Sequence, residues 1–86
     1  MIFALRYAPE AQEGLTHLAH AGLKHLAERA VLRIAADPYS GKKLVGKLSG
    51  LYAARITRRY RVVYTILPQQ HVVVILDISH RRDVYR

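Results

Sequence analysis

Residues 60–78 read YRVVYTILPQQHVVVILDI, and this stretch decides the fold. The runs Tyr60–Leu67 and Val72–Ile78 are rich in the β-branched and aromatic residues that favour strands. Residues 68–71, PQQH, are short enough to join the two runs as an antiparallel hairpin. A third run, Leu51–Thr57, precedes them and is connected through Arg58-Arg59. The second half of the chain therefore predicts three consecutive antiparallel strands.

The first half predicts a short strand over Ile2–Tyr7 and then two helices. Pro9 suits the first turn of a helix, and apolar residues follow it at helical spacing. A turn at Ala21-Gly22 leads to a second amphipathic helix, which should end at Asp37-Pro38 because a residue before proline disfavours helical geometry. Residues 39–50 are expected to form a loop or a single turn.

This order of elements predicts an α+β fold. Two N-terminal helices should pack on one face of a small, mostly antiparallel four-stranded sheet. A chain of 86 residues corresponds to one domain, spanning residues 1–86.

The composition narrows the class of protein. The absence of cysteine excludes disulfide scaffolds and thiolate zinc sites and fits a reducing cytosol. The N-terminus lacks the pattern of a signal peptide, and no apolar run approaches the ~20 residues needed to cross a bilayer. We therefore expect a cytoplasmic protein without a membrane partner.

The positive charge is concentrated in one part of the chain. The net charge is +8, and no acidic residue occurs from Pro38 to Leu76. The basic residues of that span are Lys42, Lys43, Lys47, Arg55, Arg58, Arg59 and Arg61. A field of one sign attracts polyanions, although a basic surface can also serve solubility alone. This distribution predicts a nucleic-acid partner.

Strand alternation predicts where these charges lie. Tyr60, Val62 and Tyr64 should share one face of their strand and Arg61 the other. If the apolar face packs on the helices, Arg61 and Arg55 project from the open face of the sheet. The C-terminal segment could fold over that same face.

That segment, residues 80–86, reads HRRDVYR. Guanidinium groups match the geometry of phosphate, histidine can move a proton near neutral pH, and tyrosine can stack on a base. A buried strand that ends in these side chains indicates a protein that acts on RNA.

Two motifs carry a family resemblance. Residues 60–64, YRVVY, followed by the segment 80–86, resemble the RelE toxins of the RelE/ParE superfamily. Lys43-Leu44 and Gly50-Leu51-Tyr52 are similar to the same family, and the predicted order of elements matches its microbial-RNase-like fold.

The resemblance implies the toxin of a type II toxin–antitoxin pair. Such toxins enter the ribosomal A site and cut messenger RNA, with the ribose 2′-hydroxyl as nucleophile. The implied partners are the ribosome, messenger RNA and a cognate acidic antitoxin, which can form a toxin–antitoxin hetero-oligomer. No metal and no cofactor is implied.

The resemblance also assigns roles to residues. Arg61 and Arg81 match phosphate-binding arginines, and Tyr85 matches a tyrosine that orients the nucleotide. His80 is the natural proton shuttle among them, so the predicted catalytic set is Arg61, Arg81, Tyr85 and His80. The predicted RNA-binding residues are Arg55, Lys47, Arg58 and Lys43.

One position departs from the family. Several members carry a lysine, the proposed base, two places before Arg55, where this chain has Ala53. His80, Lys47 or ribosomal RNA would then have to accept the proton.

Other interpretations stay open. The chain could be a ParE-like toxin that inhibits DNA gyrase, or an inactive member that binds only RNA and antitoxin. Arg61 could be a surface arginine, His80 a residue of a turn and Tyr85 a packing residue. Arg81 or Arg82 could pair with Asp83 or Asp77. The tyrosines of the strands could be core residues, and the N-terminal histidines could lie on a solvated helix face.

Overall fold

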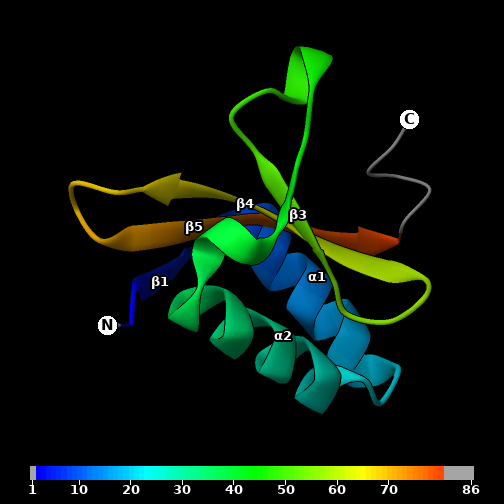
Figure 1. Cartoon of the computed structure of the whole chain (residues 1–86). Helices are drawn as coiled ribbons and strands as arrows, with labels where there is room; N and C mark the ends of the chain where they lie inside the picture. The colour runs from blue at the N-terminus through cyan, green and yellow to red at the C-terminus, as the bar shows by residue number, and fades with distance from the viewer. Residues whose placement is uncertain (1, 81–86) are drawn as a thin grey trace.

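A computed structural model of the chain describes residues 2–80. Two helices lie against one face of a five-stranded sheet (Figure 1). The elements, in chain order, are β1 Ala4–Tyr7, α1 Pro9–His20, α2 Lys24–Ala36, the 3-10 turn η1 Pro38–Ser40, β2 Lys42–Lys43, the 3-10 turn η2 Gly46–Leu48, β3 Tyr52–Arg55, β4 Tyr60–Leu67 and β5 Val72–His80. The predicted α+β class and the two-helix layer are confirmed.

The sheet has the order β1-β5-β4-β3-β2. β1 runs parallel to β5, and the remaining neighbours are antiparallel. The predicted count of four strands was wrong, because the segment expected to be a loop contains β2. This strand has only two residues, both lysines, so neither its length nor its β-propensity distinguishes it in the sequence.

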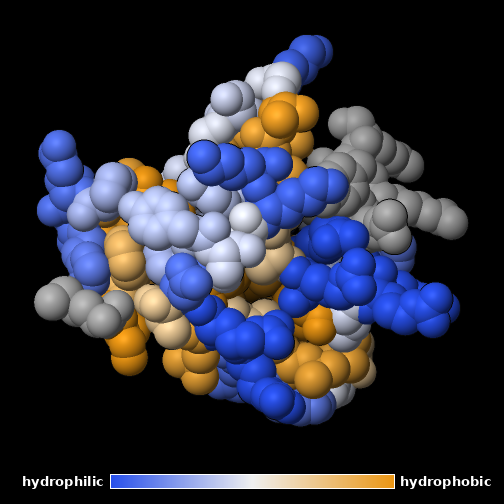
Figure 2. Space-filling model, viewed as in Figure 1, coloured by the Kyte–Doolittle hydropathy of each residue, from blue (hydrophilic) through white to orange (hydrophobic). Residues whose placement is uncertain are grey.

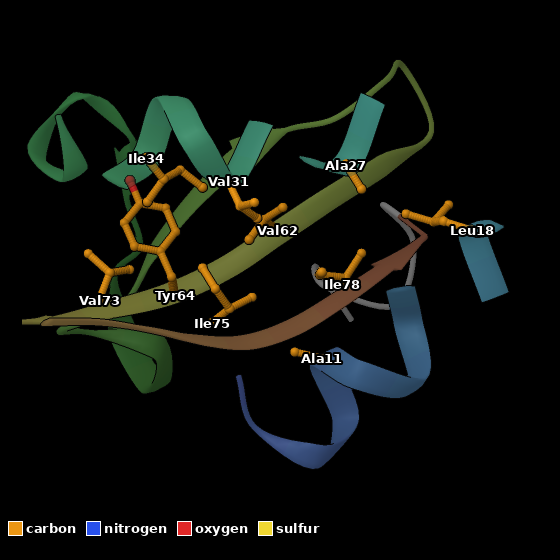
Figure 3. Close-up of a cluster of buried hydrophobic side chains, with 10 residues drawn as sticks. All are labelled: Ala11, Leu18, Ala27, Val31, Ile34, Val62, Tyr64, Val73, Ile75 and Ile78. Carbon is orange, nitrogen blue, oxygen red and sulfur yellow. The ribbon is translucent and has the colours of Figure 1, made fainter. Parts of the chain in front are cut away.

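The main core lies between the helices and the sheet, as Figure 3 shows. Val62 and Tyr64 of β4 are fully buried against Val31 and Ile34 of α2, as the strand alternation predicted. The pairing register of β4 with β5 shifts between Val63 and Tyr64 of β4, whose partners on β5 are Asp77 and Ile75. This shift interrupts the simple alternation along β5. The irregularity lets Ile75 and Ile78 both face the core although they are three residues apart.

Gly14 explains how closely α1 approaches β5. A Cβ at this position would collide with the carbonyl oxygen of Ile78. Glycine in a helix costs about 1 kcal/mol relative to alanine, and here the cost is offset by the contact between helix and strand that the missing side chain allows.

The opposite face of the sheet is partly covered by the chain itself. Leu44 packs on Ala53 and Val63 there, with Leu48 and Leu51 around them. Ala53 is only 2% exposed, so the position at which the family resemblance would expect a lysine is buried here. Only part of this face is therefore open to a partner.

Within residues 2–80, no helix is both long and apolar enough to cross a membrane.

Candidate functional site

Arg55 and Arg61 face each other across β3 and β4. Their Cα atoms are register partners in the antiparallel pair. Like charges directly opposite each other repel in a sheet, and together they form a site of concentrated positive charge. An anion between or beside the two guanidinium groups would relieve the repulsion.

These two arginines line a cleft of ≈ 410 Å³ at the edge of the sheet. Its walls come from α2, from the segment 40–42 and from β3 and β4. Four of its lining residues are basic: Arg33, Lys42, Arg55 and Arg61. We call this site the cation cleft. No carboxylate is among the residues of the 2–80 range that line it.

Tertiary packing brings Arg33 into the cation cleft from a different element. Its guanidinium Nη2 lies 3.5 Å from the carbonyl oxygen of Arg55, at the end of β3. Lys42 enters from β2, where it is the register partner of Ala53. Neither Arg33 nor Lys42 is among the site residues predicted from the sequence. Arg33 lies off the apolar stripe of its helix, and no local pattern indicates that this part of the helix faces the end of β3.

The segment 38–43 is fixed to the core by Tyr64. The Tyr64 hydroxyl donates a hydrogen bond of 2.7 Å to the carbonyl oxygen of Pro38, and the side chain is fully buried. Burial raises the pKa of Tyr64 to about 12, an effect that a backbone hydrogen bond from Gly41 opposes in part. A Cβ on Gly41 would collide with the same hydroxyl. The wall of the cation cleft that carries Lys42 is therefore held by this buried phenol together with the pairing of β2 and β3.

His80 lies in a separate cleft. Its ring meets that of Tyr60 edge-on, with the centroids 5.5 Å apart. Glu10 and Glu13 of α1 line the same cleft. His80 is the register partner of Tyr60, whereas Arg61 pairs with Ser79, so side-chain alternation directs His80 and Arg61 to opposite faces. The structure does not bring His80 to the cation cleft, and its role as proton shuttle stays a prediction.

The other predicted residues are distributed around the sheet. Lys43 is adjacent to Lys42 on β2 but lines a different groove. Lys47 belongs to η2, in a connection that projects from the body of the molecule (Figure 1). Arg58 lies in the short connection between β3 and β4, three residues beyond Arg55. Arg81 and Tyr85 lie outside the described residues.

Figure 2 shows hydrophilic side chains gathered over α2 and beside the connection between β3 and β4. Among residues 2–80, no group of three or more histidine, cysteine or acidic side chains could hold a metal ion.

Comparisons with known proteins agree with this fold. The family described as "ParE toxin of type II toxin-antitoxin system, parDE" matches residues 5–85. Toxin RelG of Mycobacterium tuberculosis is 33% identical over 87 residues, which cover 100% of this chain and 99% of that protein.

Solved structures show the same similarity. The toxin–antitoxin complex RelBE2 of M. tuberculosis contains a chain with a TM-score of 0.80 and 30% identity, covering 94% of this chain and 100% of that one. The YoeB/ParE toxin of Agrobacterium tumefaciens has a TM-score of 0.81 at 15% identity, over 91% and 98% of the two chains, and supports the fold alone. The chain belongs to the ParE toxin family of type II toxin–antitoxin systems, within the RelE/ParE superfamily.

Proposed function

We propose that this toxin is a ribosome-dependent endoribonuclease that cleaves messenger RNA in the A site. The observation that carries the proposal is the pairing of Arg55 with Arg61 in a cleft that also holds Arg33 and Lys42. Several fixed positive charges around one opening suit a phosphodiester, and guanidinium groups match its geometry.

The reaction requires charge stabilisation and two proton transfers. The ribose 2′-oxygen attacks the adjacent phosphorus and the bond from phosphorus to the 5′-oxygen breaks, leaving a 2′,3′-cyclic phosphate and a 5′-hydroxyl. The 2′-hydroxyl loses a proton to a base, and the departing 5′-oxygen gains one from an acid. Arg61 and Arg55 would stabilise the negative charge that develops on the phosphoryl oxygens.

Among the basic residues that line the cation cleft, only Lys42 could act as the base. Arginine stays protonated in proteins and cannot accept the proton. Within residues 2–80, neither a histidine nor a carboxylate lines the cleft. His80, Lys47 and a group of the ribosome remain the alternatives, and Arg81 and Tyr85 keep their proposed roles in binding phosphate and orienting the nucleotide.

An acidic antitoxin is the proposed protein partner, in a hetero-oligomer and in the cytoplasm. Structures similar to this chain include the RelBE2 complex and the YoeB–YefM complex of Staphylococcus aureus. The charge of +8 favours an acidic partner. A partner that binds only the folded toxin also stabilises it by mass action.

Expression from a tightly controlled promoter tests the nuclease. We expect growth arrest and new messenger 5′ ends within translated codons, and we expect Arg61→Ala to remove both. Arg59→Ala, an exposed arginine between β3 and β4, is the matched control and should behave like the wild type. Uncut messengers in arrested cells would exclude the proposal.

A second candidate follows from the matching family, whose description names the ParE toxin. In that case the chain would inhibit DNA gyrase and would not cut RNA. Purified gyrase and relaxed plasmid separate the two functions: inhibition of supercoiling that persists in Arg61→Ala would favour the ParE-like activity.

A further inference from the structure

A second concave surface lies on the other side of β2. This groove of ≈ 500 Å³ is lined by residues that include Tyr39, Lys43, Val45, Leu51, Tyr52 and Ile66. We call it the apolar groove. Successive side chains of a strand point to opposite sides, and Lys42 and Lys43 accordingly line the cation cleft and the apolar groove respectively.

Two large apolar side chains of this groove are open to solvent. Val45 is 83% exposed and Tyr39 55% exposed, although both lie beside buried core. Scattered exposed apolar residues are normal, but a group around a concave surface marks an interaction site. Covering Val45 and Tyr39 would add hydrophobic free energy to the binding of a partner.

The wall formed by Tyr39 is already in place. Its ring meets those of Phe3 and Tyr52 edge-on, at 6.3 Å in each case, and Tyr52 stacks on the buried Tyr64 at 5.5 Å. Pro38, the preceding residue, accepts the hydrogen bond of Tyr64. A partner would therefore meet a preformed surface and would not have to order this wall on binding.

The charge around the groove selects the occupant. Lys43 lines it, Lys42 and Lys47 are close in sequence, and no acidic residue occurs between Pro38 and Leu76. A second copy of this chain would bring another net charge of +8 and be repelled. An RNA strand offers no aliphatic side chains to cover Val45. The surface fits a protein segment that has both apolar and acidic side chains.

We propose that the apolar groove is the docking site for an acidic, apolar segment of the antitoxin, separate from the cation cleft. This inference rests on the proposed function for the existence of an acidic antitoxin. The segment would place its apolar side chains against Val45 and Tyr39 and its carboxylates beside Lys43.

Substitution of Val45 tests the docking site. The probe is the purified cognate antitoxin, and its affinity for the toxin is measured by calorimetry. Val45→Asp should weaken binding roughly tenfold or more, because it removes an apolar contact and repels carboxylates. Val45→Lys should weaken it less, because it keeps the favourable charge. Since Val45 is exposed, neither change should alter thermal unfolding.

Leu32→Asp is the matched control. Leu32 is 63% exposed on α2 and does not line the groove, so this variant should bind the antitoxin like the wild type. Equal affinity of Val45→Asp and the wild type would overturn the proposal, as would a loss confined to Leu32→Asp. A dimer of the toxin alone that Val45→Asp dissolves would assign the groove to a second copy instead.

Cleavage of ribosome-bound messenger by the same variants, without antitoxin, separates this proposal from the proposed function. Val45→Asp should cleave like the wild type. If no variant cleaves, wild type included, the nuclease proposal fails while the calorimetry still decides the docking site.

Discussion

The two concave surfaces on either side of β2 differ in almost everything except the segment that builds them. The cation cleft holds Arg33, Lys42, Arg55 and Arg61, whereas the apolar groove exposes Tyr39 and Val45. Residues 38–43 form part of both walls. Alternation along the two-residue strand β2 therefore separates the proposed polyanion surface from the proposed protein surface.

Charge reversal in the cation cleft should give the largest effect. Arg55→Glu would place a carboxylate opposite Arg61, cancel part of the field and repel a phosphate. We expect messenger cleavage to fall ~100-fold or more, comparable to the loss of a donor to a transition-state oxyanion. Antitoxin affinity, measured in parallel, should change much less. Equal losses in both assays would show that the two surfaces are one site.

Removing the anchor of the shared wall should affect both surfaces. Tyr64→Phe leaves the carbonyl oxygen of Pro38 without its donor, and we expect the free energy of unfolding to fall by about 1–3 kcal/mol in urea titrations. Cleavage and antitoxin binding should both weaken, because Lys42 and Tyr39 lie on the released segment.

Gly41→Ala tests whether the Tyr64 hydroxyl contacts the backbone at residue 41. Gly41→Ala alone should also destabilise the fold, because its Cβ meets the Tyr64 hydroxyl. In the double variant with Tyr64→Phe part of that clash disappears, so the combined loss should be smaller than the sum. Strict additivity would contradict a direct contact between the two residues.

Alkaline pH should weaken the same anchor. Burial raises the pKa of Tyr64 to about 12 from 10.0, so the unfolded chain releases this proton at lower pH than the folded chain does. The stabilisation that this pKa difference gives the folded state is complete below pH 10. It is lost as the pH rises towards 12, and the free energy of unfolding then falls by up to about 1.4 kcal/mol per pH unit. The stability difference between wild type and Tyr64→Phe should therefore shrink from pH 9 to pH 11. A constant difference would mean that Tyr64 does not titrate in this way.

Substitution of Lys42 or Lys43 should give the smallest effect on RNA binding, and it distinguishes the two surfaces most selectively. Lys42→Ala should reduce the slope of log affinity for single-stranded RNA against log salt concentration by roughly 0.7, the value for one phosphate contact. Lys43→Ala should leave that slope nearly unchanged, because Lys43 lines the apolar groove. Identical slopes for the two variants would remove the distinction between the surfaces.

Much of the fold could be predicted from periodicity. β4 begins and ends at the predicted residues Tyr60 and Leu67, and its apolar face packs on the helices as expected. β2 could not be predicted, because pairing with β3 defines it and Lys42-Lys43 has no strand pattern of its own. The cover that Leu44 forms over Ala53 likewise depends on the path of a connection.

The site was less predictable because it depends on distant contacts. Alternation along two strands was enough to predict that Arg55 and Arg61 share a face, but only the register of the structure makes them direct partners. Arg33 joins them only because α2 crosses the end of β3, and nothing within the helix sequence indicates this position. His80 was grouped with the arginines by its place in the chain, but the register pairs it with Tyr60 and not with Arg61.

Single-turnover cleavage of a messenger bound to purified ribosomes tests the central claim most directly, with Arg61→Ala compared with wild type and with Arg59→Ala. If the cation cleft binds the scissile phosphate, Arg61→Ala should cleave ~100-fold more slowly or worse while Arg59→Ala keeps the wild-type rate. Cleavage by Arg61→Ala at the wild-type rate would contradict the account.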